Sequence, residues 1–192
     1  MELLLSIAYV AFFIFLIGKL NFFVLKDISL NTIKIAYLLK IVSAISVGLV
    51  YTYYYTDRLT ADTFKFFDDS KILFDAVYTQ PFDFFRMVTG IGAGADELQP
   101  YYDKMTNWYD TFSPYNDNRA LIRLNALLRF FSLGYYYVHV VFVCFLSLTG
   151  IIAVVKVFSR EFPQKSLEIF AVFLLLPSVL FWGSGLLKDS LV

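Results

Sequence analysis

Four stretches of about twenty residues, each nearly free of charged side chains, limit most strongly how this chain can fold. They cover residues 3–25, 35–55, 132–155 and 167–187. A helix of this length crosses the hydrocarbon core of a bilayer and satisfies its own backbone hydrogen bonds there. The sequence therefore predicts an all-α, multi-pass helical membrane protein with four transmembrane helices.

The composition fits this class. Of the 192 residues, 59% are hydrophobic and only 17% are charged, whereas about a quarter of a typical soluble domain is charged. The net charge is zero, so the chain lacks a basic surface and we expect no nucleic-acid partner. Cys144 is the single cysteine, which excludes an internal disulfide, and His139 is the single histidine, which excludes a histidine cluster. We expect both to be packed residues within the third span.

The first stretch allows a second interpretation, and the last contains a helix-breaking residue. The first resembles a secretory signal peptide in length, but it carries Glu2 and no Lys or Arg ahead of its apolar run. No small-x-small cleavage site follows it, so we favour a retained transmembrane helix. The last contains Pro177, which predicts that this span is kinked or broken.

Basic residues in the short connections predict the orientation. Lys26 and Lys34 lie between the first two spans, and three further basic residues lie between the last two. Cytoplasmic connections carry an excess of Lys and Arg, so both are predicted to be cytoplasmic. The N-terminus, the long connection over residues 56–131 and the residues after the fourth span then lie on the extracytoplasmic face of the inner (cytoplasmic) membrane.

The long connection combines acidic with aromatic side chains. Eleven of the sixteen Asp and Glu residues lie within residues 57–117. A disordered acidic loop would be poor in aromatic residues, so we expect this segment to fold against the membrane. Apolar periodicity predicts amphipathic interfacial helices over 61–78 and 116–131. The glycine-rich run 90–94 is predicted to be a flexible tip, because it lacks the spacing of a phosphate loop.

Acidic residues near the start of this connection are candidates for chemistry. Asp62 follows the second span by a few residues, and a carboxylate at a membrane face can act as a general base or hold a divalent cation against a phosphate. Asp68 and Asp69 are adjacent, so at most one of them can face a given site from a helix. We interpret both as part of the solvated face of an interfacial helix.

Basic residues supply candidate phosphate ligands. Lys188 and Asp189 directly follow the fourth span, where they must lie at the interface or in a polar cavity, unless they form an ordinary polar turn. Arg119, Arg123 and Arg129 belong to the second predicted helix, and a guanidinium group donates to two phosphate oxygens at once. The alternative for these arginines is anchoring to lipid headgroups.

This pattern resembles the GT-C superfamily of membrane glycosyltransferases. In that family a span is followed by a large external loop, which opens with a D-E-x-x-Y-x-x-x-A motif and continues into interfacial helices. The corresponding run here is Asp62-Thr63-x-x-Phe66-x-x-x-Ser70, in which Thr63 replaces the second acid. A later Pro-Ser run that ends in Lys-Asp corresponds to residues 177–189. The chain is also similar to membrane proteins of Bacteroidetes-type bacteria.

The resemblance implies an enzyme that transfers a sugar, with inversion, from a polyprenyl-phosphate-linked donor to a glycan, lipid or protein acceptor. It implies that Asp62 is the general base or a ligand of Mg²⁺ or Mn²⁺, and that Asp189 is the second acid. Lys188, with Arg119 or Arg123, would neutralise the leaving phosphate. Members of the family carry more spans, so the four found here are expected to be the N-terminal part of a longer chain.

Two other hypotheses need the same topology but no shared acidic site. One is a non-catalytic flippase, polymerase partner or assembly subunit of surface-polysaccharide export. The other is a structural membrane segment without activity of its own. A separation of more than about 20 Å between the carboxylates of Asp62 and Asp189 would exclude one shared site.

Overall fold

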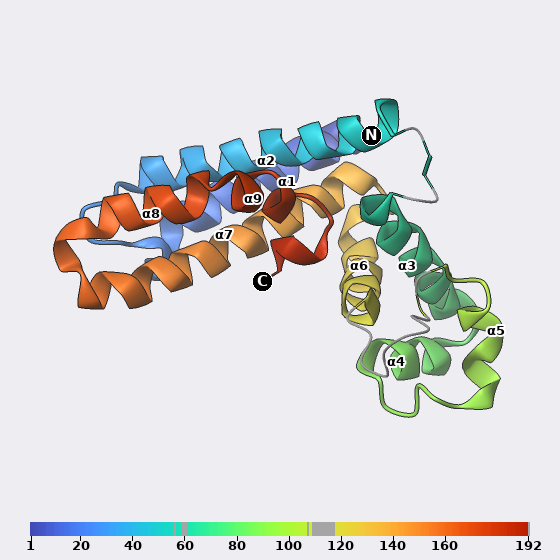
Figure 1. Cartoon of the computed structure of the whole chain (residues 1–192). Coiled ribbons are helices and arrows are strands. Elements are labelled where there is room, and N and C mark those ends of the chain that lie inside the picture. Colours follow the sequence, from blue (N-terminus) through green and yellow to red (C-terminus); the bar gives the residue numbers. More distant parts are fainter. Residues whose placement is uncertain (56, 59–60, 107, 109–117, 192) are drawn as a thin grey trace.

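The structure, a computed structural model, describes residues 1–55, 57–58, 61–106, 108 and 118–191. Every regular element within these residues is a helix, so the predicted all-α class is confirmed. The helices over residues 2–53 and 136–180 lie side by side in a bundle, and the helices over residues 62–132 form a layer across one end of it (Figure 1). We call the helices over residues 62–132 the layer, and the end of the bundle that they cover the layer end.

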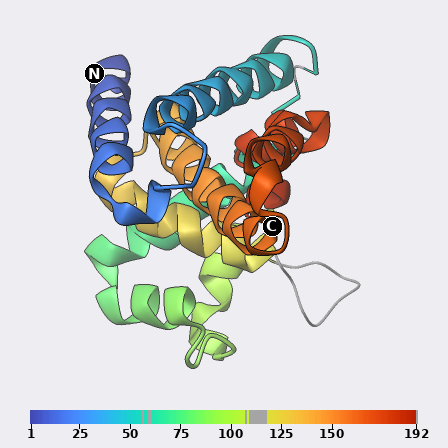
Figure 2. The same ribbon diagram turned by 90° about the vertical axis from the view of Figure 1, so that its left-hand side faces the viewer.

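Among the described residues, three helices have the length and composition of membrane spans, namely α1 (Glu2–Lys19), α2 (Leu30–Tyr53) and α7 (Tyr136–Glu161). α7 lies in the middle of the bundle, where it contacts α1, α2 and the C-terminal helices (Figure 2). Aromatic rings pack between these helices. The ring centre of Phe13 in α1 lies 4.3 Å from that of Phe145 in α7. The outward faces of the bundle expose many large apolar side chains, as expected of a membrane protein.

The fourth predicted span is broken. α8 (Ser166–Leu175) and α9 (Pro177–Leu180) belong to a helix pair that bends by 63°. Proline has no N–H to donate and disfavours a helical conformation in the residue before it, so the chain breaks at Pro177. Two short 3-10 turns follow, η4 (Trp182–Ser184) and η5 (Lys188–Ser190). The break at Pro177 is confirmed, whereas the regular helix expected up to residue 187 is not observed.

In the part of the chain that the structure describes, the layer contains four α-helices, two of which lie where the sequence predicts them. α3 (Asp62–Thr79) and α6 (Asn118–Ser132) pack against each other across the layer end. They match the predictions over 61–78 and 116–131, of which residues 116 and 117 lie outside the described residues. α4 (Pro81–Thr89) and α5 (Gln99–Tyr102) complete the layer and were not predicted.

The layer has a hydrophobic core of its own, separate from that of the bundle. Leu73, Met87, Leu98, Trp108 and Ile122 are all fully buried in it. The predicted glycine-rich tip is a tight turn, in which two glycines adopt positive φ angles. The acidic connection is thus a packed helical unit, because its aromatic and aliphatic residues bury one another.

The boundaries of three spans differ from the predictions. The first helix ends at Lys19 rather than at residue 25, and the second covers 30–53 rather than 35–55. The third begins at Tyr136 rather than at residue 132. Leu133 and Gly134 have φ angles of 54° and 78°, a left-handed conformation that no helix can contain, so α6 and α7 are separate helices.

Candidate functional site

Asp62 is the first residue of α3, at the point where the layer joins α2 (Figure 1). Its carboxylate lies 3.2 Å from Nζ of Lys65, one turn further along the helix, and its side chain remains 61% exposed. Asp62 is therefore a solvent-accessible carboxylate at the boundary between the bundle and the layer.

The neighbouring acids point in different directions. Asp68 accepts two hydrogen bonds from Arg58, at 2.8 Å from Nε and 2.7 Å from Nη2. The hydrogen bond with Asp68 is the main reason why the pKa of Arg58 is raised. Asp69 is buried and accepts a 2.9 Å hydrogen bond from the backbone N–H of Thr106. The prediction that both acids are solvated is therefore wrong for Asp69, which links α3 to the end of the α5 region.

Lys188 and Asp189 lie in η5, directly after a buried run of five residues, 183–187. Lys188 is half-buried and Asp189 is exposed. Within the described residues, no basic side chain forms an ion pair with both Asp62 and Asp189. Tyr51 in the last turn of α2 contacts this segment, since its ring centre lies 6.4 Å from that of Trp182 in η4.

Arg119 and Arg123 both lie against Trp108 in the layer. Their guanidinium carbons are 5.2 and 5.4 Å from the centre of the Trp108 ring system. Arg119 Nε donates to the Trp108 carbonyl at 3.1 Å, and Arg123 Nε donates to the Met87 carbonyl at 2.8 Å. Burial and the nearby Arg119 charge lower the pKa of Arg123. Both arginines help to hold the layer together, and their role in binding a phosphate stays a prediction.

Arg129 is more deeply buried than the other two arginines. It donates to the Ser70 hydroxyl at 2.8 Å and to the Phe67 carbonyl at 2.5 Å, and its guanidinium carbon lies 4.3 Å from the centre of the Phe67 ring. Burial lowers its pKa to about 10, so the group remains charged at neutral pH. These bonds join α6 to α3 where both meet the bundle.

A buried polar chain at this junction was missed by the sequence analysis. Nδ1 of His139 lies 2.8 Å from Asn125 Oδ1, and Nε2 lies 2.6 Å from Ser132 Oγ, which accepts from the Gly134 N–H. Since Asn125 Oδ1 can only accept, Nδ1 carries the hydrogen and Nε2 accepts from Ser132. The expectation that His139 is a packed residue of the third span is confirmed, and the residue lies in the first turn of α7.

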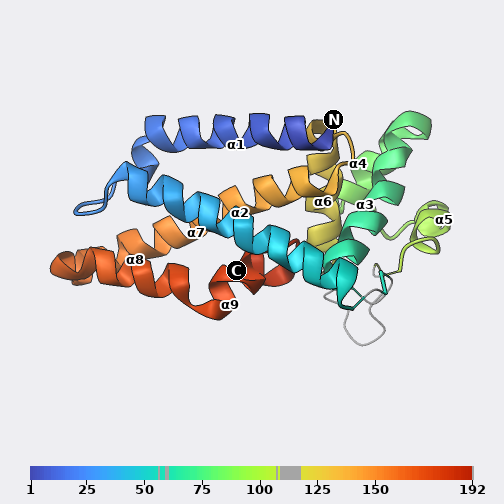
Figure 3. The same cartoon turned by 90° about the horizontal axis from the view of Figure 1, so that it is seen from above.

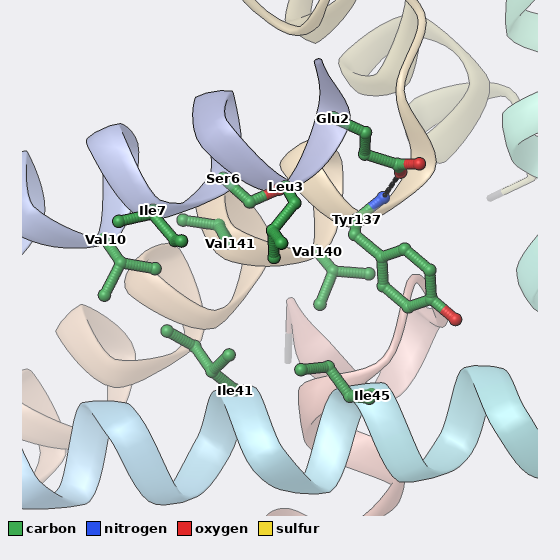
Figure 4. A pocket seen from close by; sticks show the side chains of 10 residues that line it. All are labelled: Glu2, Leu3, Ser6, Ile7, Val10, Ile41, Ile45, Tyr137, Val140 and Val141. Carbon is green, nitrogen blue, oxygen red and sulfur yellow. Dashed lines mark hydrogen bonds between the residues drawn. The ribbon is translucent and has the colours of Figure 1, made fainter.

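An apolar cavity of about 330 Å³ lies between α1, α2 and α7 (Figure 4). α1 and α2 diverge toward the layer end, which opens the cavity between them (Figure 3). Near its polar end, Glu2 accepts a 2.9 Å hydrogen bond from the Tyr137 backbone N–H at the start of α7. A carboxylate is favourable at the N-terminus of a helix. This contact places the N-terminus at the layer end of the bundle.

The described residues contain no group of three or more His, Cys, Asp or Glu side chains that could hold a metal ion. The predicted Mg²⁺ or Mn²⁺ on Asp62 therefore stays a prediction. Comparison of the chain with family models, with curated proteins and with solved structures found no match.

Proposed function

We propose that this protein is a membrane glycosyltransferase-like protein that uses a polyprenyl-phosphate-linked sugar on the extracytoplasmic face of the inner membrane. The observation that supports it best is the position of Asp62, an exposed carboxylate that opens α3 where the layer meets a membrane-spanning helix. The resemblance to the GT-C superfamily assigns the catalytic base to this position. The layer across the bundle end also matches the external interfacial helices that the resemblance implies.

The orientation in this proposal follows from the basic connections. Lys26 follows α1, and Arg160 and Lys165 lie around the turn between α7 and α8. All three belong to connections at the end of the bundle opposite the layer (Figure 1). Since basic connections stay in the cytoplasm, the layer and the N-terminus belong outside.

In the proposed reaction the Asp62 carboxylate removes the proton from an acceptor hydroxyl group as the hydroxyl oxygen attacks the anomeric carbon of the sugar. The bond from that carbon to the phosphate oxygen breaks, and the polyprenyl phosphate leaves with the bonding electrons. Lys188 would stabilise the leaving phosphate, and Asp189 would be the second acid at the site. Arg119 and Arg123 would act on the phosphate over a longer range, because their Nε atoms bind backbone carbonyls. The acceptor is a glycan, lipid or protein.

Replacing Asp62 with asparagine tests the proposal. We expect sugar transfer from a synthetic polyprenyl-phosphate donor, assayed with the full-length protein in liposomes, to fall at least about 100-fold, because general-base catalysis is lost. Asp75→Asn is the matched control, since Asp75 is also an exposed acid of α3 that pairs with a lysine of its own helix. That variant should retain activity within about twofold, because an exposed ion pair of this kind contributes little.

Transfer at the wild-type rate by the Asp62→Asn variant would remove Asp62 from the mechanism. The absence of any transfer by the wild-type protein would instead favour the non-catalytic role in polysaccharide export. Repeating the assay with EDTA and then with added Mg²⁺ or Mn²⁺ measures whether the reaction needs a divalent cation.

A further inference from the structure

Lys40 is a charged residue whose side chain is completely buried inside the bundle. It lies on α2 and is 0% exposed. Within the described chain no carboxylate lies within ion-pair distance of it. Its Nζ atom instead donates to two backbone carbonyls of the C-terminal segment, Gly183 at 2.9 Å and Val179 at 3.4 Å. Ionisable groups inside a membrane-spanning region are costly and tend to be functional, so this arrangement requires an explanation.

The broken fourth span explains why these carbonyls need donors. A helix that breaks inside a bundle leaves carbonyl groups without helical partners, and hydrocarbon offers them none. Ser147 Oγ of α7 donates to the same Gly183 carbonyl at 2.8 Å, and Cys144 Sγ donates to the Ser184 carbonyl at 3.4 Å. Donors from α2 and α7 thus converge on one turn. The ammonium group of Lys40 carries the positive charge that favours the negative end of a helix.

This turn lies inside the bundle rather than at its end. Lys40 is about 15 Å from the start of α2, and Ser147 is about 16 Å from the start of α7, at 1.5 Å per residue. The two helices start at opposite ends of the bundle, so both estimates place the turn near mid-depth (Figure 3). Gly185 packs closely here, since a Cβ atom on it would lie 3.2 Å from Val47 Cγ1. Beyond α9 the chain therefore folds back between α2 and α7.

The fold-back also determines where the Lys-Asp pair lies. A Cβ atom on Gly183 would be 3.4 Å from the carbonyl oxygen of Asp189, so η5 packs directly on the turn that Lys40 binds. We propose that Lys40 is a positioning residue, which anchors the fold-back segment 177–187 inside the bundle and thereby sets the place of Lys188 and Asp189. The anchoring stands on its own contacts, whereas its effect on sugar transfer rests on the proposed function.

A disulfide-trapping experiment tests the anchor without any activity assay. In a Cys144→Ser background, which retains a donor to Ser184, the pair Val47→Cys and Gly185→Cys should form a cross-link when the protein is oxidised in liposomes. Adding Lys40→Met should slow the cross-link at least fivefold, because the turn loses its charged donor. Adding Lys40→Arg, which keeps the charge and its donors, should restore at least half of the rate.

Two further variants keep the test decisive. Lys34→Met makes the same chemical change six residues earlier on α2, where the lysine is only partly buried, and it should leave the cross-linking rate unchanged. Ser147→Ala removes the second donor to Gly183 while the Lys40 charge remains, so it should slow the cross-link less than Lys40→Met does. A cross-linking rate that is the same with methionine as with lysine at position 40 would overturn the anchor.

The effect on transfer separates this inference from the proposed function. If both hold, Lys40→Met lowers kcat at least tenfold and Lys40→Arg restores it, while Asp62→Asn abolishes transfer without changing the cross-link. A lysine-dependent cross-link in a protein that transfers no sugar would retain the anchor and reject the enzyme. Transfer that depends on Asp62, combined with a cross-link that does not depend on Lys40, would retain the enzyme and reject the anchor.

Discussion

Replacing Trp108 with alanine is expected to destabilise the layer by about 3–5 kcal/mol, the usual cost of removing a buried tryptophan. Trp108 is 1% exposed, and its ring stacks on that of Tyr102 at 4.6 Å between centres. It is also the surface on which Arg119 and Arg123 lie, so the substitution removes their cation–π contacts as well. The free energy of unfolding in detergent and the rate of amide hydrogen exchange in α6 measure the effect.

Trp182 supplies the control, because the chain has two tryptophans and this one is 39% exposed. Its edge contact with Tyr51 is its closest described aromatic contact outside its own segment. Trp182→Ala should therefore cost clearly less than Trp108→Ala, since a larger part of the Trp182 side chain is already exposed. Equal losses in the two variants would mean that the layer has no core centred on Trp108.

Trp108 also shows why the role of the arginines could not be read from the sequence. The spacing of Arg119 and Arg123 correctly predicts that both lie on one face of a helix. It does not reveal which group meets that face, and the structure places Trp108 there, from a segment before α6. Two arginines four residues apart on a helix are therefore compatible both with a phosphate-binding site and with a structural contact to an aromatic ring.

The spans were predicted because hydrophobicity alone identifies them, but hydrophobicity does not set where they end. Residues 132–155 form one apolar run, yet Leu133 and Gly134 adopt a left-handed turn that divides it. A glycine beside an apolar residue was the available signal for this turn. Pro177 was interpreted correctly because proline breaks a helix through its own covalent structure, whatever surrounds it.

The burial of Lys40 could not be predicted from the sequence. Near the start of a predicted span it is easily taken for a residue that reaches the membrane surface. The structure buries it instead, because carbonyl groups about 140 positions later in the chain need a donor. The position of Asp62 at the start of α3, by contrast, was predicted correctly because it depends only on the local junction of a span with a helix, and its catalytic role stays a prediction.

His139 and Asn125 are expected to depend on each other strongly for stability. His139→Leu leaves Asn125 Oδ1 buried without a donor, and Asn125→Leu leaves Nδ1 of His139 without an acceptor. Each single variant should lose about 2–4 kcal/mol, because an unpaired buried polar group retains its full desolvation cost. Gly134 N–H donates to Ser132 Oγ, and neither substitution removes these two atoms, so we expect the turn between α6 and α7 to remain capped in both variants.

The double variant should be destabilised by at least about 1.5 kcal/mol less than the sum of the two single losses, because no polar atom of the pair remains unpaired. The measurement is a double-mutant cycle of unfolding free energies in detergent. Asn125→Leu combined with Lys34→Met provides the comparison: these sites share no described contact, so their effects should add within about 0.5 kcal/mol. Simple additivity in the His139–Asn125 cycle would show that the two side chains do not interact in the folded protein. A large coupling would instead identify this pair as the connection that fixes α6, and with it the layer, to the first turn of α7.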